Sequence, residues 1–329
     1  MELRNKMRRA AELLALLFLA AAMVTGCFRT PEKTEDGRLK VVTTLFPYYD
    51  FVRQVAGDRV NLTLVVPAGM DSHSFEPTPA DMITIQGADV LICNGGEMEQ
   101  WLTQVLDSID TSHMKIVTMM DYVDAVEEEH VEGMEDADHD HNHGDDDDGH
   151  EMEIEYDEHI WTSPVNAMAI VKIIGNTLKE ALPQEADRFD ANEKAYLGEL
   201  KQLDQDFRQV VANGKRHMII VADKFPFRYF ADEYGLSYRA AFSGCSADTE
   251  PSAQTIAYLI DKVKEDHIPA VYYLELSSHS TARVIGEETG AKPLLLHSCH
   301  NVTRREFDQG VTYLQLMRRN VESLREGLD

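Results

Sequence analysis

Four histidines lie in short polar segments where their imidazoles could bind a metal ion. His73 lies in "GMDSHSFEPTP", His159 in "DEHIWTSP", and His297 and His300 in "LLLHSCHN". Zinc in proteins takes about four nitrogen, oxygen or sulfur ligands in a tetrahedral arrangement, and imidazole is among its preferred ligands. A single loop histidine more often caps a helix or forms a local hydrogen bond. Histidines in three loops of similar context together predict a shared metal site.

Five further histidines lie in an acidic segment at residues 127–158. They are His130, His139, His141, His143 and His150. The segment holds seventeen acidic residues and no Lys or Arg, so it carries most of the formal net charge of −27. Such a composition favours solvated chain over a packed core, and a His-rich composition alone specifies no ligand geometry. We expect either an accessory loop that raises the local metal concentration or a merely solubilising loop.

The elements that must position these histidines alternate between strand and helix. Strand patterns recur in two sets, at 40–46, 60–66, 88–94 and 115–120, and then at 217–223, 237–243, 270–276 and 291–297. Between the sets, residues 185–214 show helical spacing of apolar residues without an internal proline. Strands that alternate with helices predict an α/β fold with mostly parallel sheets. We therefore expect an N-terminal lobe at 39–184, a long rigid linker helix at 185–214 and a C-terminal lobe at 215–329.

The histidine segments fall where strands end. His73 lies between a strand and a helix that Thr78 should cap, with Pro79 in its first turn and Asp81 three residues after the cap. His159 precedes a similar start at Pro164, and "HSCH" follows the last strand. In α/β proteins, ligands bind outside the carboxyl ends of the strands. These positions predict a metal site in the cleft between the two lobes.

The N-terminus has the pattern of an export signal. Residues 1–26 combine a basic start with the apolar run "LLALLFLAAAMV", which is short for a membrane span. The run closes on "VTGC", which resembles the lipobox of bacterial lipoproteins, where lipid is attached to the cysteine, here Cys27. A plain secretory signal or an anchor helix is the alternative. Residues 27–38 would form a flexible tether.

Export would place the other three cysteines in an oxidising compartment, where disulfides persist. Cys93 lies inside an apolar strand pattern, which predicts a buried core thiol. Cys245 and Cys299 both follow strand-like runs. A disulfide between these two and a pair of free thiols are both open alternatives.

Several segments resemble, in order and spacing, the metal-binding receptor lipoproteins of bacterial zinc and manganese ABC importers, the ZnuA-type family. They are "VVTTLFPYYDFVRQVAGD", "VVPAGMDSHSFEPTPADM", "ADVLICNGGEMEQWL", "DEHIWTSP" and "IGEETGAKPLLL". The resemblance runs from Lys40 to the C-terminal helix. It implies two α/β lobes joined by one long helix, with the metal between them. It also implies a monomeric, lipid-anchored protein outside the cytoplasm that captures Zn²⁺ and delivers it to an ABC permease and its ATPase.

The resemblance also assigns ligands. His73 and His159 match the family's first two ligands. The third, a His or Glu in the family, falls on Lys224, which cannot bind a metal when protonated, with Asp223 beside it. The fourth, a carboxylate in the family, falls within "HSCHN".

We therefore expect His73, His159 and His297 as ligands, with His300 next and Asp223 as a weaker oxygen donor. Glu275 is expected to support the site. Nitrogen-rich ligation favours zinc over manganese.

Other classes of function fit less well. The negative charge argues against nucleic acid or an anionic membrane surface as a direct partner. An exported zinc hydrolase would need an open metal position and a general base, but the sequence contains neither an HExxH motif nor a nucleophile elbow. An extracellular zinc buffer or adhesin that uses the acidic loop is the main alternative, and the protein is not expected to be an enzyme.

Overall fold

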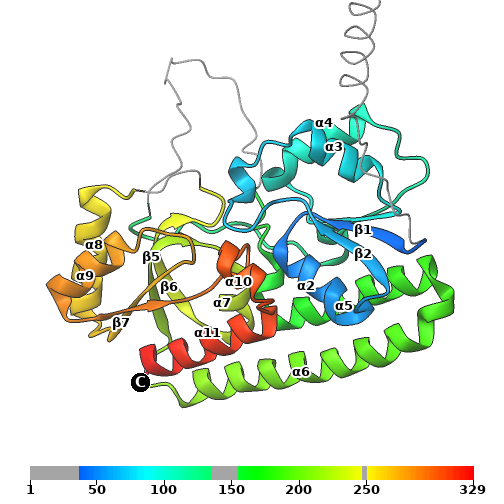
Figure 1. Ribbon diagram of the computed structural model, residues 1–329. Helices are drawn as coiled ribbons and strands as arrows, with labels where there is room; N and C mark the ends of the chain where they lie inside the picture. The colour runs from blue at the N-terminus through cyan, green and yellow to red at the C-terminus, as the bar shows by residue number, and fades with distance from the viewer. Residues whose placement is uncertain (1–36, 135–154, 247–249) are drawn as a thin grey trace, which may run out of the picture. The chain divides into compact units, whose positions relative to one another are not determined.

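The computed structural model describes residues 37–134, 155–246 and 250–329. Residues 39–329 form one compact unit that contains two four-stranded parallel sheets (Figure 1). The strand orders are β2-β1-β3-β4 and β6-β5-β7-β8. The strands are β1 (Leu39–Thr43), β2 (Val60–Leu64), β3 (Val90–Cys93), β4 (Lys115–Thr118), β5 (Met218–Phe225), β6 (Ser237–Ser243), β7 (Ala270–Tyr273) and β8 (Lys292–Leu295). The predicted α/β class with two parallel sheets is confirmed.

Helices connect the parallel strands and cover the sheets. They are α2 (Phe46–Ala56), α3 (Pro79–Gln86), α4 (Gln100–Ser108), α5 (Pro164–Ala181), α6 (Ala186–Asn213), α7 (Arg228–Tyr234), α8 (Ala253–Glu265), α9 (Ser280–Thr289), α10 (Arg304–Asp308) and α11 (Tyr313–Gly327). At the start of α3, the Thr78 side chain accepts the N–H of Asp81, and the Asp81 carboxylate accepts the N–H of Thr78. This is the predicted capping box, and it fixes where the His73 loop ends.

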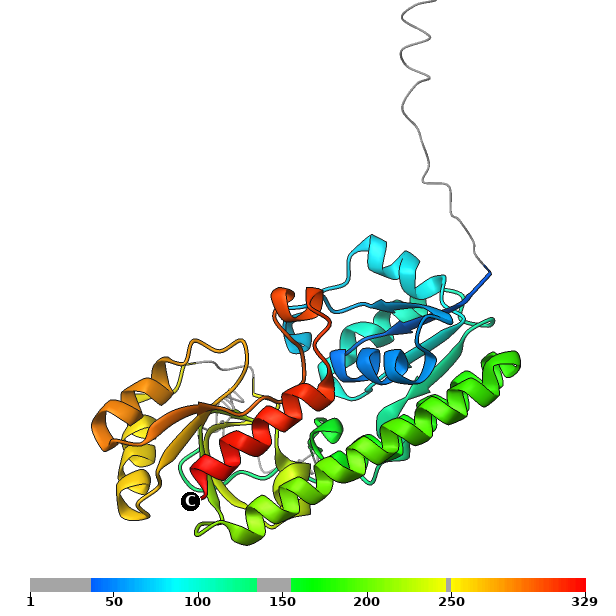
Figure 2. The ribbon, with the colours of Figure 1, turned by 60° about the horizontal axis from the view of Figure 1, so that its bottom comes forward.

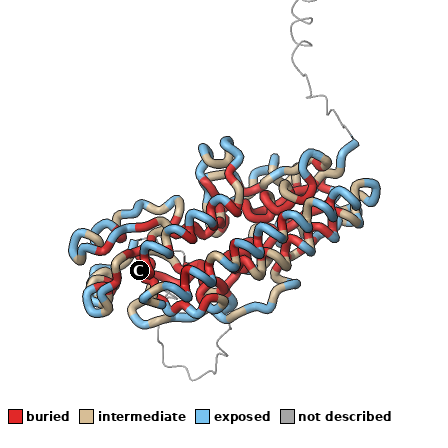
Figure 3. The backbone as a smooth tube through the Cα atoms, turned by 90° about the horizontal axis from the view of Figure 1, so that it is seen from below, coloured by how far each residue is buried: buried red, intermediate tan, exposed pale blue. Residues whose placement is uncertain are grey.

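The long helix α6 runs beneath both sheets and packs against α2, α5 and α11 (Figures 1 and 2). Its apolar residues recur at helical spacing and are buried, whereas the residues of the opposite side are exposed or half-buried (Figure 3). The buried set is Phe189, Tyr196, Leu200, Leu203, Phe207, Val210 and Val211. One hydrophobic cluster includes these residues together with residues of both lobes. The expected long helix between the lobes is therefore present, and it shares a core with each of them.

Both ends of the acidic segment are attached to the folded body. Glu127 pairs with Tyr156 in an antiparallel bridge, and Val131 and Met134 pack against the main core. The expectation that the whole segment resists packing was therefore wrong for its ends. The physical reason is that two apolar side chains interrupt the acids, and that nearby acids find basic partners, as Glu129 does with Arg228.

Several expected features fall outside the described residues. They are the signal at 1–26, the lipidation site Cys27, most of the tether at 27–38, and His139, His141, His143 and His150. His130 is described and is exposed. Within the described part of the chain, we find no helix with the length and apolarity that crossing a bilayer requires.

The cysteines of the described chain are free thiols. Cys93 is buried in β3, as predicted, and burial raises the pKa of its thiol to about 12. Cys299 is fully buried, whereas Cys245 is partly exposed. Of the two alternatives for Cys245 and Cys299, the structure has the free thiols, and the disulfide is not formed.

Candidate metal centre

Three imidazoles from three separate loops meet in the described part of the chain. His73, His159 and His300 each offer one nitrogen, and these nitrogens all lie within 4.8 Å of one another. Their ring centroids are 5.6 to 5.9 Å apart. Two nitrogens bound to one zinc ion at tetrahedral angles would be about 3.3 Å apart, given zinc–nitrogen bonds of about 2.0–2.1 Å. Small side-chain movements would bring the three nitrogens to that spacing.

His73 lies in a single 3₁₀ turn, Ser72–Ser74, in the loop between β2 and α3. The carboxylate of Asp71 caps this turn by accepting the N–H of His73 at 3.0 Å. Nε2 of His73 is buried, and no described residue forms a hydrogen bond with it. Burial, with His300 and His159 nearby, lowers the pKa of His73 to about 3. The imidazole is therefore neutral at physiological pH, which is the form that binds a metal.

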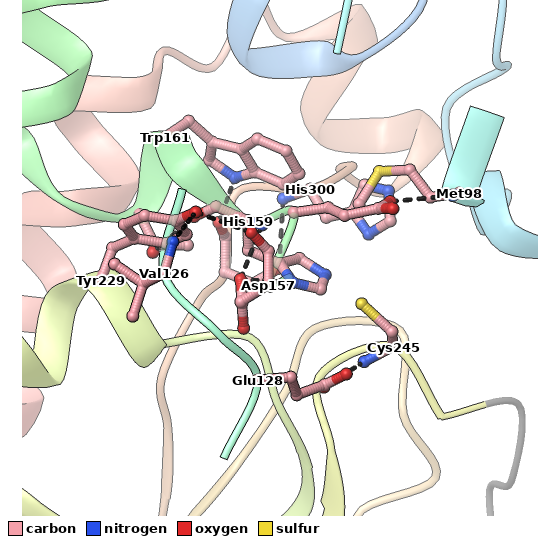
Figure 4. Close-up of polar contacts among 12 residues, drawn as sticks. Met98, Val126, Glu128, Asp157, His159, Trp161, Tyr229, Cys245 and His300 are labelled. Carbon is pink, nitrogen blue, oxygen red and sulfur yellow. Dashed lines mark hydrogen bonds and ion pairs between the residues drawn. The ribbon is translucent and has the colours of Figure 1, made fainter. Parts of the chain in front are cut away.

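His159 directly precedes a 3₁₀ turn at Ile160–Thr162 and is almost completely buried. Asp157 accepts its backbone N–H at 2.8 Å, and the same oxygen lies 3.2 Å from Nδ1 of the ring (Figure 4). Burial alone would lower the pKa of His159, but the Asp157 carboxylate, with Glu128 and Glu158, outweighs it and raises that pKa. A carboxylate on one ring nitrogen orients the imidazole and leaves the other nitrogen for a metal.

The segment that carries His159 is held on both sides. The carboxylate of Glu158 accepts the N–H groups of Glu97 and Met98, and Asn94 donates its amide to the carbonyl of Glu158 at 3.0 Å. On the other side, the hydroxyl of Tyr229 donates to the carbonyl of Asp157 at 2.7 Å (Figure 4). These contacts join the His159 segment to the loop after β3 in one lobe and to α7 in the other.

His300 comes from the loop after β8, on the opposite lobe from His73 and His159. Glu275 organises this loop by accepting the N–H and the hydroxyl of Ser298, and the Ser298 oxygen in turn accepts the N–H of His300 at 3.1 Å. The ring of His300 contacts the hydroxyl of Ser72 through Nε2. Burial and, to a smaller extent, the nearby His159 lower the pKa of His300 to about 4, so this imidazole is also neutral.

His297 and Asp223 do not join the three imidazoles. Nδ1 of His297 accepts the N–H of Cys299 at 2.9 Å and lies 3.3 Å from Glu275. The backbone at Cys299 has a φ of 61°, and His300, unlike His297, lines the cavity. The expected order of His297 before His300 is therefore reversed. Nε2 of His297 is buried and has no hydrogen-bond partner among the described residues.

A cavity of about 250 Å³ opens beside the three imidazoles. Residues of both lobes line it, among them Asp71, Asp223 and Lys224. The Lys224 ammonium lies 3.7 Å from the Asp71 carboxylate. Asp223 accepts the N–H of Lys224 at 2.9 Å, and burial raises the pKa of its carboxyl group. The site is thus a nitrogen-rich, partly enclosed cavity whose wall carries one lysine and three acids, Asp71, Asp223 and Glu275.

Three supporting residues were not singled out by the sequence analysis. Asp157, within the quoted motif "DEHIW", orients His159, and Asp71 caps the turn that carries His73. Trp161 lies against the site, with its ring centroid 5.5 Å from those of His159 and His300, and its indole donates to the carbonyl of Ser298 at 2.9 Å (Figure 4). The usable signal was an acid two residues before a loop histidine, in both "MDSH" and "YDEH".

Comparison with known proteins gives one matching family and many relatives. The family described as "Zinc-uptake complex component A periplasmic" (ZnuA) matches residues 41–327. The zinc-binding lipoprotein AdcA of Streptococcus pneumoniae is 32% identical over 319 residues, which cover 96% of this chain and 60% of AdcA. The high-affinity zinc uptake system protein ZnuA of Bacillus subtilis is 33% identical over 319 residues, which cover 95% of this chain and 97% of that protein.

The similarity extends to solved structures. The zinc-bound ZnuA-like domain of S. pneumoniae AdcA superimposes with a TM-score of 0.70 at 30% identity, and the match covers 89% of this chain and all of that domain. This chain spans 60% of full-length AdcA, so it corresponds to one part of that longer protein.

Proposed function

Because the chain belongs to the ZnuA family of zinc-uptake components, we propose that it is the zinc-binding receptor of an ABC importer. It is a binding protein, as the members of this family are, and it is not an enzyme. The observation that carries the proposal is the meeting of His73, His159 and His300, with ligand nitrogens within 4.8 Å of one another. His73 and His159 come from one lobe and His300 from the other, so a metal bound to all three would hold the lobes together.

The three imidazole ligands indicate which metal ion the protein transports. Three imidazole nitrogens suit zinc, whereas manganese prefers oxygen-rich sites. Asp71 and Asp223 line the cavity, but among the described residues neither joins the group of three imidazoles. We therefore propose Zn²⁺ as the transported ion, with Mn²⁺ bound much more weakly. The names of AdcA and of the B. subtilis relative, both described by zinc, support this choice.

Delivery requires partners that the chain itself does not supply. We propose that the loaded protein docks on a membrane permease driven by its ATPase, and that docking favours a conformation with lower zinc affinity. In this proposal a monomer acts outside the cytoplasm, at the bacterial cell envelope, and lipid on Cys27 keeps it at the membrane. The name of AdcA, a zinc-binding lipoprotein, supports that location.

The accessory loop can be separated from the site by a clean deletion. The N–H of Glu128 donates to the carbonyl of Glu155 at 2.9 Å, and Met134 and Asp157 line the same small pocket, so the chain before and after the loop lies close together. Removing residues 135–154 and joining Met134 to Glu155 through a short Gly-Ser linker should leave the fold intact. The deletion removes His139, His141, His143 and His150 while keeping all three imidazoles of the site.

The test is a Zn²⁺ titration of the metal-free protein against a competing chelator, repeated with Mn²⁺. We expect one tight equivalent of zinc in both the complete and the loop-deleted chain, and its loss in His159→Ala. The matched control is His217→Ala, which removes an exposed histidine outside the site. If the loop-deleted chain bound no zinc tightly, the acidic loop would be the binder and the protein a zinc buffer.

A further inference from the structure

Lys224, near the end of β5, lies in the wall of the metal cavity. It is only 14% exposed. Its ammonium group lies 3.7 Å from the Asp71 carboxylate, which is longer than a hydrogen bond. The charge is therefore held inside the cavity, in an ion pair that is not closed by a short hydrogen bond. A buried cation of this kind attracts an anion.

The three imidazoles leave room for a fourth ligand. Zinc is usually bound by four groups, and an open position is taken up by water or another small ligand. Three imidazoles also bring no negative charge of their own to the ion. No carboxylate of the described residues belongs to the imidazole group. An anionic fourth ligand would supply both the missing bond and the missing negative charge.

The cavity has the space for such a ligand. Its volume is about 250 Å³, whereas one water molecule takes up about 30 Å³ in the liquid. A bare ion would leave most of this volume to solvent. Besides Lys224, the cavity is lined by the hydroxyl group of Ser277, the amide group of Asn301 and three acids, Asp71, Asp223 and Glu275. Lys224 is the only Lys or Arg side chain that the described residues contribute to this lining, so an anion would bind on its side of the cavity.

We propose that a small oxyanion of the carboxylate or carbonate type completes the site, binding the metal through one oxygen and pairing with the ammonium group of Lys224. The inference rests on the proposed zinc function and names the class of co-ligand that the same site takes. Metal and anion then bind cooperatively, because each makes a contact that the other provides.

The test measures the zinc affinity of the complete chain in a buffer that does not coordinate metals. Chelator competition is run at constant ionic strength with sodium bicarbonate, with sodium acetate, or with neither. By linkage, the apparent Kd for zinc should fall about tenfold when the anion is present at ten times its own Kd. The bicarbonate and acetate arms distinguish carbonate from an organic carboxylate.

Variants at Lys224 test whether its ammonium charge holds the anion. Lys224→Met should remove the dependence on the anion, whereas the control Lys201→Met, on the exposed face of α6, should keep it. Lys224→His offers a fourth imidazole and should bind zinc tightly without any anion dependence. In the wild-type chain loaded with Co²⁺, the visible absorption spectrum should change when the anion is added.

Three results would contradict the inference or the zinc function, and the measurements distinguish them. If neither anion changes the apparent Kd or the Co²⁺ spectrum while zinc still binds tightly, the inference is wrong and the zinc function stands. If Asp71→Asn weakens zinc binding as strongly as His300→Ala, then Asp71 is the fourth ligand and the inference is likewise wrong. If the wild-type chain binds no zinc tightly under any condition, the proposed function itself fails.

Discussion

The carboxylate of Asp157 holds His159 at two points, accepting its backbone N–H at 2.8 Å and lying 3.2 Å from Nδ1 of its ring. Both residues are almost completely buried. One oxygen therefore fixes the position of the backbone and the orientation of the imidazole together. This contact determines which ring nitrogen faces the other two histidines.

Replacing Asp157 by Asn should weaken zinc binding without removing a ligand. The amide keeps the size of the side chain but loses the charge that supports the imidazole, and such supporting carboxylates contribute about 10- to 100-fold in metal affinity. Chelator competition would measure the change, with Asp107→Asn, an exposed acid on α4, as the control. An unchanged Kd for zinc would mean that the Asp157 contact does not serve the site.

His300 and His297 should differ in what their removal costs. His300→Ala removes one of the three imidazoles, and we expect zinc affinity to fall by about 100-fold or more. His297→Ala removes the acceptor for the N–H of Cys299, so we expect a loss of about 1–3 kcal/mol in unfolding free energy. Zinc titration and urea unfolding of both variants separate the two roles. A larger loss of zinc affinity in His297→Ala would restore His297 as the ligand.

The lobes and the long helix were predictable because their signals are local. Alternating strand and helix patterns predict parallel sheets, and an uninterrupted apolar spacing from Phe189 to Val211 predicts one long helix. Thr78 and Asp81 predict the start of α3 through chemistry that spans three residues. Such features depend on neighbours in the sequence, which the sequence itself displays.

The choice between His297 and His300 was not predictable in the same way. It depends on the left-handed backbone at Cys299 and on Glu275, which is 23 residues from Ser298. The packing of Val131 and Met134 likewise depends on contacts with the core that a local composition of acids conceals. Where contacts between residues far apart in the chain determine which side chains reach the site, the sequence alone shows only the candidate residues.

Asn301 connects the loop after β8 to the loop after β2. Its amide donates to the carbonyls of Pro67 at 2.8 Å and Met70 at 2.7 Å, and its carbonyl oxygen accepts the N–H of Val302. Asn301→Asp keeps the acceptor and loses both donors, so we expect a loss of about 2 kcal/mol or more in unfolding free energy. Urea unfolding of the metal-free protein measures it.

The same substitution should also weaken zinc binding, because the Asn301 contacts position His300 against His73. Asn301→Ala is the companion variant, since it removes the donors without adding a charge. Equal stability of the wild-type protein and both variants would show that these two hydrogen bonds do not hold the lobes together.

The carboxyl group of Glu275 should make the unfolding free energy of the metal-free protein depend on pH under acidic conditions. Burial alone would raise the pKa of its carboxyl group, but His297 and the hydrogen bonds from Ser298 outweigh burial and lower that pKa from 4.5 to about 2. Since the carboxylate is favoured in the folded state, its contribution is present above about pH 4.5 and is lost as the pH falls toward 2. A shift of this size corresponds to a contribution on the order of 3 kcal/mol.

Urea unfolding of the metal-free wild-type protein and of Glu275→Gln at pH 5.5, 4.5 and 3.5 measures this contribution, because the other carboxyl groups are common to both proteins. The stability advantage of the wild-type protein should shrink as the pH falls. Ser298 supplies a second check, since Ser298→Ala removes one hydrogen bond to the carboxylate and should reduce the pH-dependent part without abolishing it. A stability difference that stayed constant over this pH range would contradict a charged Glu275 as the support of the His300 loop.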